Sequence, residues 1–308
     1  MKTISLVVAL LLVGVAGGHA ADQPVPPAAV ASGWSIQASF DVIDLARRKG
    51  ANVPIASGLG TGDLNLGHKA GADLRIAVAF RSFGVEGRYL GNFEWQDQRA
   101  TEGATAVFST PQINFAPRTV MGQYVSDFSS YEINAFWQAH SRVRVFGGYR
   151  RFNVAESLAA DIGAGTATYT VATQNRLSGV QAGIALRVLE GADLSPAIAG
   201  LYGDVTGRIG SYENTDAMTT TSIGVAGAVP FIAASGSGRT TAFELDASIG
   251  YRVTPNVSVY AGYRYLKLRG LALAPENFAS ANILTGTATI ARADATYDGV
   301  FTGIRLGW

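Results

Sequence analysis

Charged side chains alternate with apolar ones along many segments of this chain, and arginines and carboxylates occupy equivalent positions in that alternation. Glu244 and Asp246 alternate with Phe243 and Leu245, and Arg264 falls between two tyrosines further along. The planar guanidinium of arginine pairs with carboxylates through two parallel hydrogen bonds, which favours ion-pair networks in a confined space. If water fills that space, the same charges set the selectivity of a path for small ions.

Eight acidic residues and ten arginines fall on the polar side of the alternating segments. Because arginines are in excess, a water-filled path between them would favour small anions. The eighteen residues are Asp41, Asp73, Arg75, Arg81, Glu86, Arg88, Glu94, Glu132, Arg144, Arg150, Arg187, Asp204, Arg208, Glu244, Asp246, Arg252, Arg264 and Arg305.

Catalytic chemistry has little support in this sequence. Nucleophilic catalysis usually requires a histidine base, and beyond residue 20 only His68 and His140 remain. His68 is the one candidate base, with Asp63 or Asp73 to orient it, whereas His140 lies in a predicted turn. No set of histidines and carboxylates has the spacing of a metal site. We therefore expect no enzymatic activity, no metal and no cofactor.

The N-terminus has the three parts of a secretory signal. Lys2 precedes an apolar run from Ile4 to Val15, and a small-residue exit ends at Ala20; such a run is too short to span a bilayer as a helix. We expect residues 1–20 to be a cleaved signal peptide, residues 21–32 a flexible periplasmic lead-in, and residues 33–308 a single domain. A retained N-terminal anchor is the alternative, but no basic flank follows the apolar run.

Composition excludes several classes of partner and of stabilisation. Of the 24 basic residues only Lys2 lies in the signal, so the remaining chain has 23 basic and 23 acidic residues. A neutral chain has no electrostatic footprint for nucleic acid. The sequence has no cysteine, so disulfides cannot stabilise an exported domain.

Ten segments alternate with the two-residue period of a strand. The intervals between them swing from long to short, and the long ones are Asp44–Lys69, Gln96–Gln123, Ser211–Gly238 and Gly270–Arg292. The segments are Gly33–Ile43, Gly71–Arg81, Phe83–Trp95, Tyr131–Gln138, Arg142–Arg150, Val180–Val188, a stretch through Asp204 and Arg208, Phe243–Arg252, Val257–Tyr265 and Tyr297–Trp308.

This rhythm predicts a closed, antiparallel, up-and-down transmembrane β-barrel with long outer loops and short periplasmic turns. An open sheet is excluded in a bilayer because every backbone polar group must be paired. Ten strands are expected. Twelve is the alternative, with Thr105–Phe115 and Thr220–Ala234 as extra strands, although Pro111 and Pro230 oppose central pairing. A soluble β-sandwich would also give alternating strands, but aromatics near the strand ends favour membrane girdles.

The final segment, YDGVFTGIRLGW, resembles the closing strand of Gram-negative outer-membrane β-barrels, in which a terminal aromatic is a signal for the assembly machinery. Together with Ser126–Leu158 and Phe243–Phe278, it is similar to a poorly characterised group of proteobacterial and planctomycete pore-forming barrels. The resemblance implies an outer-membrane location, contact with lipid, Trp308 as the assembly signal and no catalytic residues.

Two functions remain open. We expect a small passive pore for ions or small solutes, lined by the arginines and carboxylates named above. The alternative is a structural or adhesive outer-membrane protein whose interior is closed by ion pairs and which binds through its outer loops. The loops have no recognition motif, so no ligand is predicted.

Overall fold

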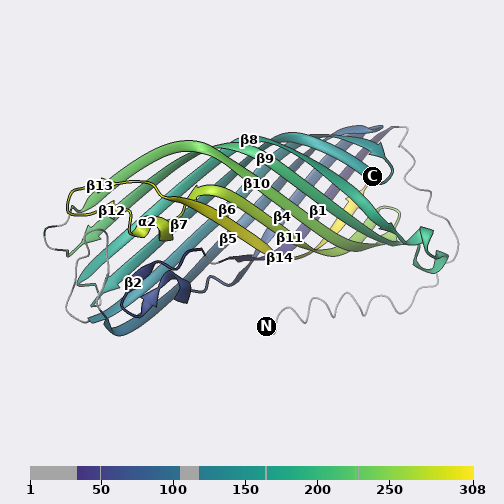
Figure 1. The fold of residues 1–308 in the computed structure, drawn as a ribbon. Coiled ribbons are helices and arrows are strands. Elements are labelled where there is room, and N and C mark those ends of the chain that lie inside the picture. The colour runs from purple at the N-terminus through teal and green to yellow at the C-terminus, as the bar shows by residue number, and fades with distance from the viewer. Residues whose placement is uncertain (1–32, 49, 105–117, 164, 226, 228) are drawn as a thin grey trace.

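The computed structural model describes residues 33–48, 50–104, 118–163, 165–225, 227 and 229–308, and these form a closed β-barrel (Figure 1). The expected signal peptide and lead-in lie outside the described residues. Neighbouring strands follow the order β1-β14-β11-β10-β9-β8-β7-β6-β5-β4, and every pairing is antiparallel. The prediction of a ten-stranded, antiparallel, up-and-down barrel is confirmed. The ten strands are β1 Trp34–Arg47, β4 His68–Phe80, β5 Phe83–Ala104, β6 Arg118–His140, β7 Val143–Ile162, β8 Ala167–Glu190, β9 Leu201–Ile223, β10 Phe231–Thr254, β11 Val257–Ala272 and β14 Arg292–Gly307.

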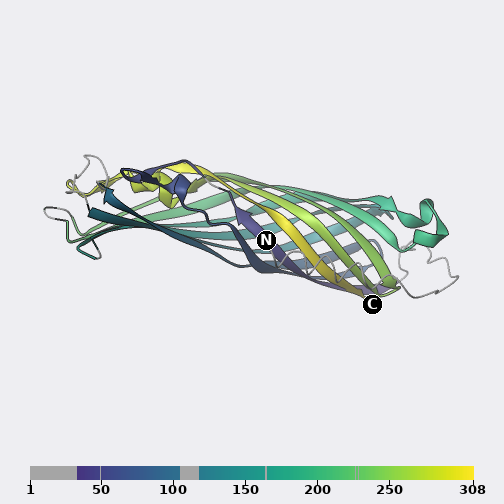
Figure 2. The same ribbon diagram turned by 90° about the horizontal axis from the view of Figure 1, so that it is seen from below.

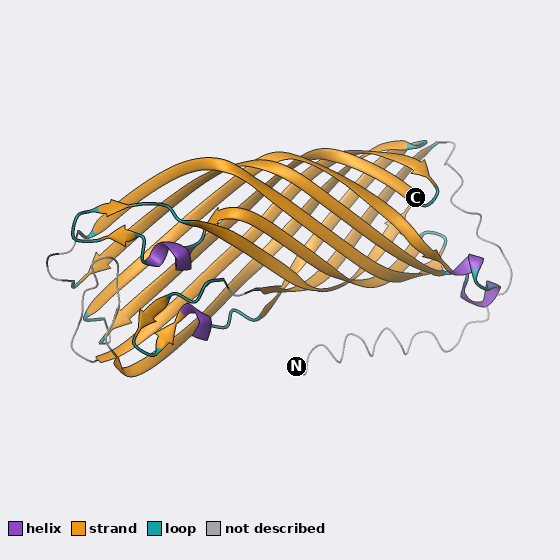
Figure 3. Cartoon of the chain, in the orientation of Figure 1, coloured by secondary structure: helices purple, strands orange, loops and turns teal. Residues whose placement is uncertain are grey.

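Short elements lie at the two ends of the barrel (Figures 2 and 3). One end, at which β1 begins and β14 finishes, is called the terminal end here, and the opposite end is called the outer end. Among the described residues no helix is long and apolar enough to span a bilayer. The short elements are β2 Pro54–Ala56, β3 Leu59–Gly60, η1 Thr61–Asp63, α2 Ala274–Phe278, β12 Ala281–Asn282 and β13 Thr287–Ala288 at the outer end, with η2 Gly191–Asp193 and η3 Pro196–Ile198 at the terminal end.

The first and last strands close the barrel. β1 pairs with β14 from Gln37 opposite Gly307 to Arg47 opposite Tyr297. Beyond this ladder, Trp308 donates its backbone N–H to Ile36 and accepts one from it, both at 2.9 Å. The closure leaves no open sheet edge, as a bilayer requires.

Connections at the terminal end are mostly tight, and those at the outer end are mostly longer, which agrees with the predicted rhythm. Two connections differ. β8 and β9 are joined at the terminal end through η2 and η3, and β7 and β8 are joined at the outer end across only residues 163–166.

The polarity of the two faces of the sheet inverts along the barrel: the inward side chains change from charged to apolar. On β7, Val145 and Tyr149 face outward and Arg150 inward near the terminal end, whereas further out Phe152 and Val154 are buried inside. The longest strands have 24 residues, or about 80 Å of chain at roughly 3.3 Å per residue. A membrane crossing needs only about 9–11 residues. The apolar outer belt therefore covers one part of the barrel, and the other part projects beyond it with a polar wall and an apolar interior.

This projection corrects the predicted loops. Much of Gln96–Gln123 and Ser211–Gly238 belongs to β5, β6, β9 and β10. Thr220–Ala234 extends β9 and β10 and does not supply an extra strand, while Thr105–Phe115 lies outside the described residues. The outward side chains of these extensions are mostly polar or small because they meet water, so the alternation expected for a lipid-facing strand disappears there.

A bulge in β5 reverses the faces of the residues that follow it. The pairing with β6 shifts between Leu90 and Phe93, and Asn92 has a left-handed φ of 67°. One extra residue moves all subsequent side chains to the opposite face. The placement of Glu94 inside the barrel was therefore wrong: Glu94 faces out, and Trp95 faces in and donates its indole N–H to the Leu45 carbonyl at 3.0 Å.

Candidate functional site

Glu244 of β10 lies at the centre of a charged cluster inside the barrel. Its carboxylate is 2.6 Å from Arg150 Nη1, 2.7 Å from Arg208 Nη1 and 2.9 Å from Arg88 Nη1. Arg264 Nε lies 3.5 Å away. These arginines come from β5, β7, β9 and β11, so one carboxylate links four strands across the lumen.

Three further acids bridge the same arginines and balance their charge. The pairs are Asp73 with Arg88 at 2.6 Å and Arg264 at 2.7 Å, Asp246 with Arg264 at 2.7 Å and Arg208 at 2.9 Å, and Glu132 with Arg150 at 3.3 Å and Arg88 at 3.6 Å. Four guanidinium groups thus face four carboxylates. The side chains of Arg88, Arg264 and Glu244 are each only 1% exposed, so the cluster fills the lumen at this level.

A second, more exposed group of ion pairs lies between the cluster and the terminal end. Glu86 pairs with Arg144 at 2.7 Å, and Asp204 pairs with Arg187 at 2.8 Å. Arg75 lies near Glu86 and contributes to its electrostatic environment. Further pairs are Arg305 with Asp204 at 3.6 Å, Arg252 with Glu190 at 2.6 Å and Arg187 with Glu190 at 3.6 Å.

Of the predicted lumenal arginines, Arg81 lies elsewhere. It is exposed in the tight β4–β5 turn with a left-handed φ of 56°. Because β4 ends at Phe80, Arg81 belongs to the turn and faces solvent at the terminal end. Asp41 is buried inside as expected, where Tyr260 donates its hydroxyl proton to the Asp41 carboxylate.

The outer half of the lumen is filled by apolar side chains, which the sequence analysis did not identify. Trp95, Phe128, Phe152 and Tyr297 are buried together, and Phe128 and Tyr297 have ring centroids 4.8 Å apart. The one signal for these inward aromatics in the sequence is that, in the outer halves of the strands, apolar residues take the positions that charged residues hold nearer the terminal end.

The segment between β11 and β14 folds into the outer mouth of the barrel. Phe278 of α2 is fully buried, and its carbonyl accepts the Tyr169 hydroxyl at 3.0 Å. Glu156 accepts the Ala274 amide N–H at 3.1 Å and binds Arg47 Nη2 at 3.1 Å. This segment therefore plugs the lumen above the charged cluster, whereas the sequence pattern predicts only a long outer loop at Gly270–Arg292.

Burial shifts the pKa of one acid in the plug. The pKa of Glu276 is raised, first because burial disfavours its charge and also because Glu156 lies nearby. Backbone N–H groups, including that of Ala51, oppose this shift.

The histidines do not form a catalytic arrangement among the described residues. His68 Nδ1 lies 3.6 Å from Asp44 Oδ2 on the outer wall, and not beside Asp63 or Asp73. Asp73 points into the lumen instead. His140 contacts Ser141, 3.4 Å away, at the terminal end. Within the described part of the chain, no group of three or more histidine, aspartate or glutamate side chains could hold a metal ion.

The closed sheet, the apolar belt on its outer wall and the charged lumen define a transmembrane β-barrel. No family model matches the sequence, and no curated protein matches it. Solved structures give low similarity over most of the chain. The outer-membrane protease OmpT from Escherichia coli has a TM-score of 0.44 at 10% identity, covering 90% of this chain and 97% of that one.

Two other structures overlap to a comparable extent. The translocator domain of the autotransporter NalP from Neisseria meningitidis has a TM-score of 0.43 at 9% identity, covering 99% of this chain and 95% of that one. The Ralstonia pickettii toluene transporter TbuX has a TM-score of 0.35 at 9% identity, with 90% and 89% covered. Likenesses at this level assign no activity to this chain.

Proposed function

We propose that this chain is a structural protein of the Gram-negative outer membrane, with a non-conducting lumen and a rigid outer end that projects from the membrane. The observation that carries the proposal is the burial of the central cluster, in which the side chains of Arg88, Glu244 and Arg264 are 1% exposed. A continuous water path at this level would wet these groups.

Two barriers in series support a closed lumen. The first is the ion-pair cluster around Glu244, and the second is the apolar layer with α2 above it. Breaking either barrier alone leaves the other in place. Buried, paired charges also resist rearrangement, because separating them exposes uncompensated charge.

A passive pore is the second candidate. Its specific support is a set of buried polar atoms without a hydrogen-bond partner in the described residues, namely Arg75 Nε, Arg150 Nη2 and Arg208 Nε. Such atoms are places where internal waters bind. Isolated waters do not make a path, so the geometry favours the closed alternative.

The projecting wall supports a role at the cell surface. On β9, Ser211, Glu213 and Thr215 face outward while Tyr212 is buried. A stiff sheet with its own apolar interior holds the outer connections away from the membrane, as binding through the loops would require.

Planar-bilayer recording of the refolded protein tests the proposal. We expect no discrete conductance steps over many verified insertions, whereas a porin reconstituted in parallel gives steps. Discrete steps of the unaltered protein would overturn the closed-lumen proposal and establish the pore.

Loop binding needs a separate test. Replacing residues 105–117 with a short glycine-rich linker keeps every residue of β5 and β6, and cells that carry this variant should lose attachment to a surface that the full chain binds. Attachment that is unchanged would remove adhesion through residues 105–117 from consideration.

A further inference from the structure

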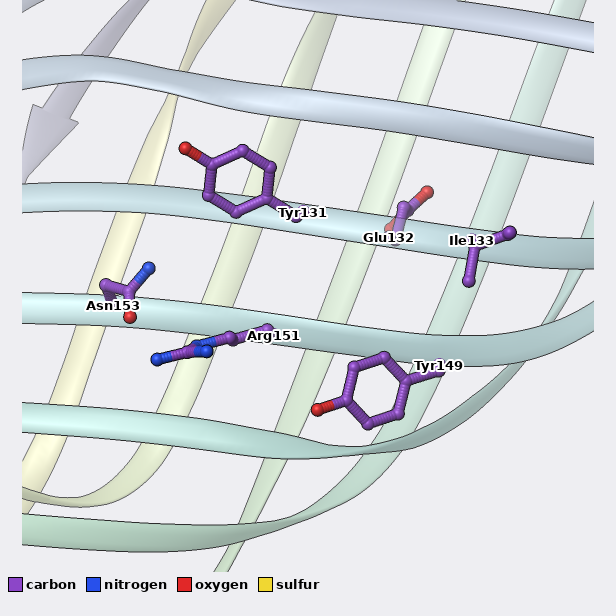
Figure 4. A pocket seen from close by; sticks show the side chains of 6 residues that line it. All are labelled: Tyr131, Glu132, Ile133, Tyr149, Arg151 and Asn153. Atoms are coloured by element: carbon purple, nitrogen blue, oxygen red, sulfur yellow. The ribbon is translucent and has the colours of Figure 1, made fainter.

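A shallow groove of about 530 Å³ runs along the outer wall between β6 and β7 (Figure 4). Tyr131 lies directly opposite Arg151, and Ile133 lies opposite Tyr149. The hydroxyl groups of both tyrosines and the guanidinium of Arg151 extend toward the Asn153 side of the groove, which is the outer side. The lining residues are Tyr131, Glu132, Ile133, Tyr149, Arg151 and Asn153.

The groove crosses the border of the apolar belt. On its terminal side the outward residues are large and apolar, as Ile133, Trp137 and Val145 illustrate. On its outer side they are mostly polar or small, as Asn153 on β7 and Ser129 and Asp127 on β6 illustrate. Tyrosines at such a border place their rings in the membrane interface and their hydroxyls in water.

Arg151 forms no ion pair with a carboxylate of the described residues. Glu132 is part of the same stretch of β6, but its carboxylate turns into the lumen and pairs with Arg150 at 3.3 Å. Arg151 and Arg176 have no carboxylate partner in the described part of the chain, unlike the arginines of the central cluster. Arg176 of β8 lies opposite Asn153, so it adds a second guanidinium to the same face.

The ring of Tyr131 is held in place from the other side. Tyr89 of β5 packs against it with a ring-centroid distance of 4.9 Å, and the Tyr89 hydroxyl donates to Asn92 at 3.0 Å. One wall of the groove is therefore ordered before any ligand arrives, which reduces the entropy lost on binding.

We propose that this groove binds the phosphate-bearing headgroup of a membrane lipid, with the acyl chains lying along Ile133 and the apolar belt below it. Arg151 supplies a bidentate, charge-assisted contact to the phosphate, and Arg176 adds a second positive charge. The tyrosine hydroxyls and Asn153 donate to the remaining headgroup oxygens. A lipid fits better than a soluble phosphate because the groove lies on the outer wall at the border of the apolar belt, where lipid headgroups join their acyl chains.

The test is native mass spectrometry of the refolded, full-length barrel in detergent with phosphatidic acid added. Phosphatidylcholine with the same acyl chains is the control for the headgroup. Arg151→Ala and Arg151→Gln remove the charge from the groove. Arg118→Ala removes an exposed arginine at the outer end of β6, away from the belt, and is the matched control. Band shift between unheated and boiled samples checks that each variant is folded.

We expect phosphatidic acid to bind in preference to phosphatidylcholine, at least a fivefold loss of bound lipid in both Arg151 variants, and less than a twofold change in Arg118→Ala. Equal losses in Arg118→Ala and the Arg151 variants would overturn the proposal, as would equal binding of the two lipids. Displacement of the lipid by sodium phosphate alone would also overturn it, because a soluble anion would then be the occupant. The outcome does not depend on whether the lumen conducts.

Discussion

The side-chain amide of Asn175 pairs with both backbone groups of Ala272. Asn175 Nδ2 donates to the Ala272 carbonyl at 2.7 Å, and its Oδ1 accepts the Ala272 N–H at 2.8 Å. The amide thus continues the strand-like pairing of β11 across the lumen just before α2. This side chain ties the end of β11, from which the plug begins, to β8, which lies three places away in the sheet order.

Asn175→Asp should loosen the plug without opening the barrel. An ionised aspartate still accepts the N–H of Ala272 but cannot donate to its carbonyl, and an unsatisfied buried group costs about 1–3 kcal/mol. Hydrogen exchange should therefore accelerate in residues 273–291 and stay unchanged in β1 and β14. Bilayer recordings of the variant should remain silent because the charged cluster is intact; regular conductance steps would show that the plug is the sole barrier.

Glu244→Gln should destabilise the barrel strongly. The change leaves four buried arginines facing three acids, and breaking a buried charge pair costs about 3–5 kcal/mol. The measurement is guanidinium-induced unfolding in detergent, followed by tryptophan fluorescence. Glu213→Gln on the exposed face of β9 is the matched control. Its free energy of unfolding should lie within about 0.5 kcal/mol of that of the original chain.

Charge balance gives the same prediction a second test. Arg208→Gln combined with Glu244→Gln restores neutrality, so the double variant should lose less stability than the sum of the two single variants. Strict additivity would mean that the cluster acts as separate contacts and not as a balanced network.

Glu276 should make the docking of the plug depend on pH. Its pKa is raised by burial, so the folded protein favours the neutral acid. The stabilisation of the folded state by this group is then fully present below the unfolded pKa of about 4.3 and is lost as pH rises through the folded pKa. Protection of residues 273–291 from proteolysis should therefore be greater at pH 4 than at pH 7.5.

Glu276→Gln stays neutral throughout this range and should flatten that profile, with greater protection at pH 7.5. Glu102→Gln, an exposed acid in β5, should keep the original profile. Identical profiles for the original chain and Glu276→Gln would assign the pH dependence to another group.

Trp308→Ala separates assembly in the cell from stability of the finished barrel. The backbone of Trp308 pairs with Ile36, but its side chain is 65% exposed. The free energy of unfolding of the refolded variant should therefore lie within about 0.5 kcal/mol of that of the original chain, as is usual for a surface substitution. The amount of heat-modifiable barrel in cell envelopes should fall several-fold if Trp308 is the assembly signal, and unchanged amounts would remove that role.

The sequence alone determined the strands that cross the membrane, because their periodicity is local. From Phe243 to Arg252, outward apolar residues such as Phe243 and Leu245 alternate with inward polar ones such as Glu244 and Asp246. This period, together with the need to pair every backbone group in lipid, predicts a closed barrel and places Arg150, Glu244 and Arg264 inside it.

The tertiary structure decided what the lumen contains and where the pattern changes. Glu244 meets arginines from four strands, and which residues face one another depends on strand register, which no single segment encodes. The bulge at Asn92 turned Glu94 outward, and the projection beyond the lipid inverted the alternation, since water replaced acyl chains as the outer solvent. Only the packed barrel shows that the segment holding Phe278 folds back into the mouth. The apolar side chains of this segment are buried there by residues that are distant in the sequence.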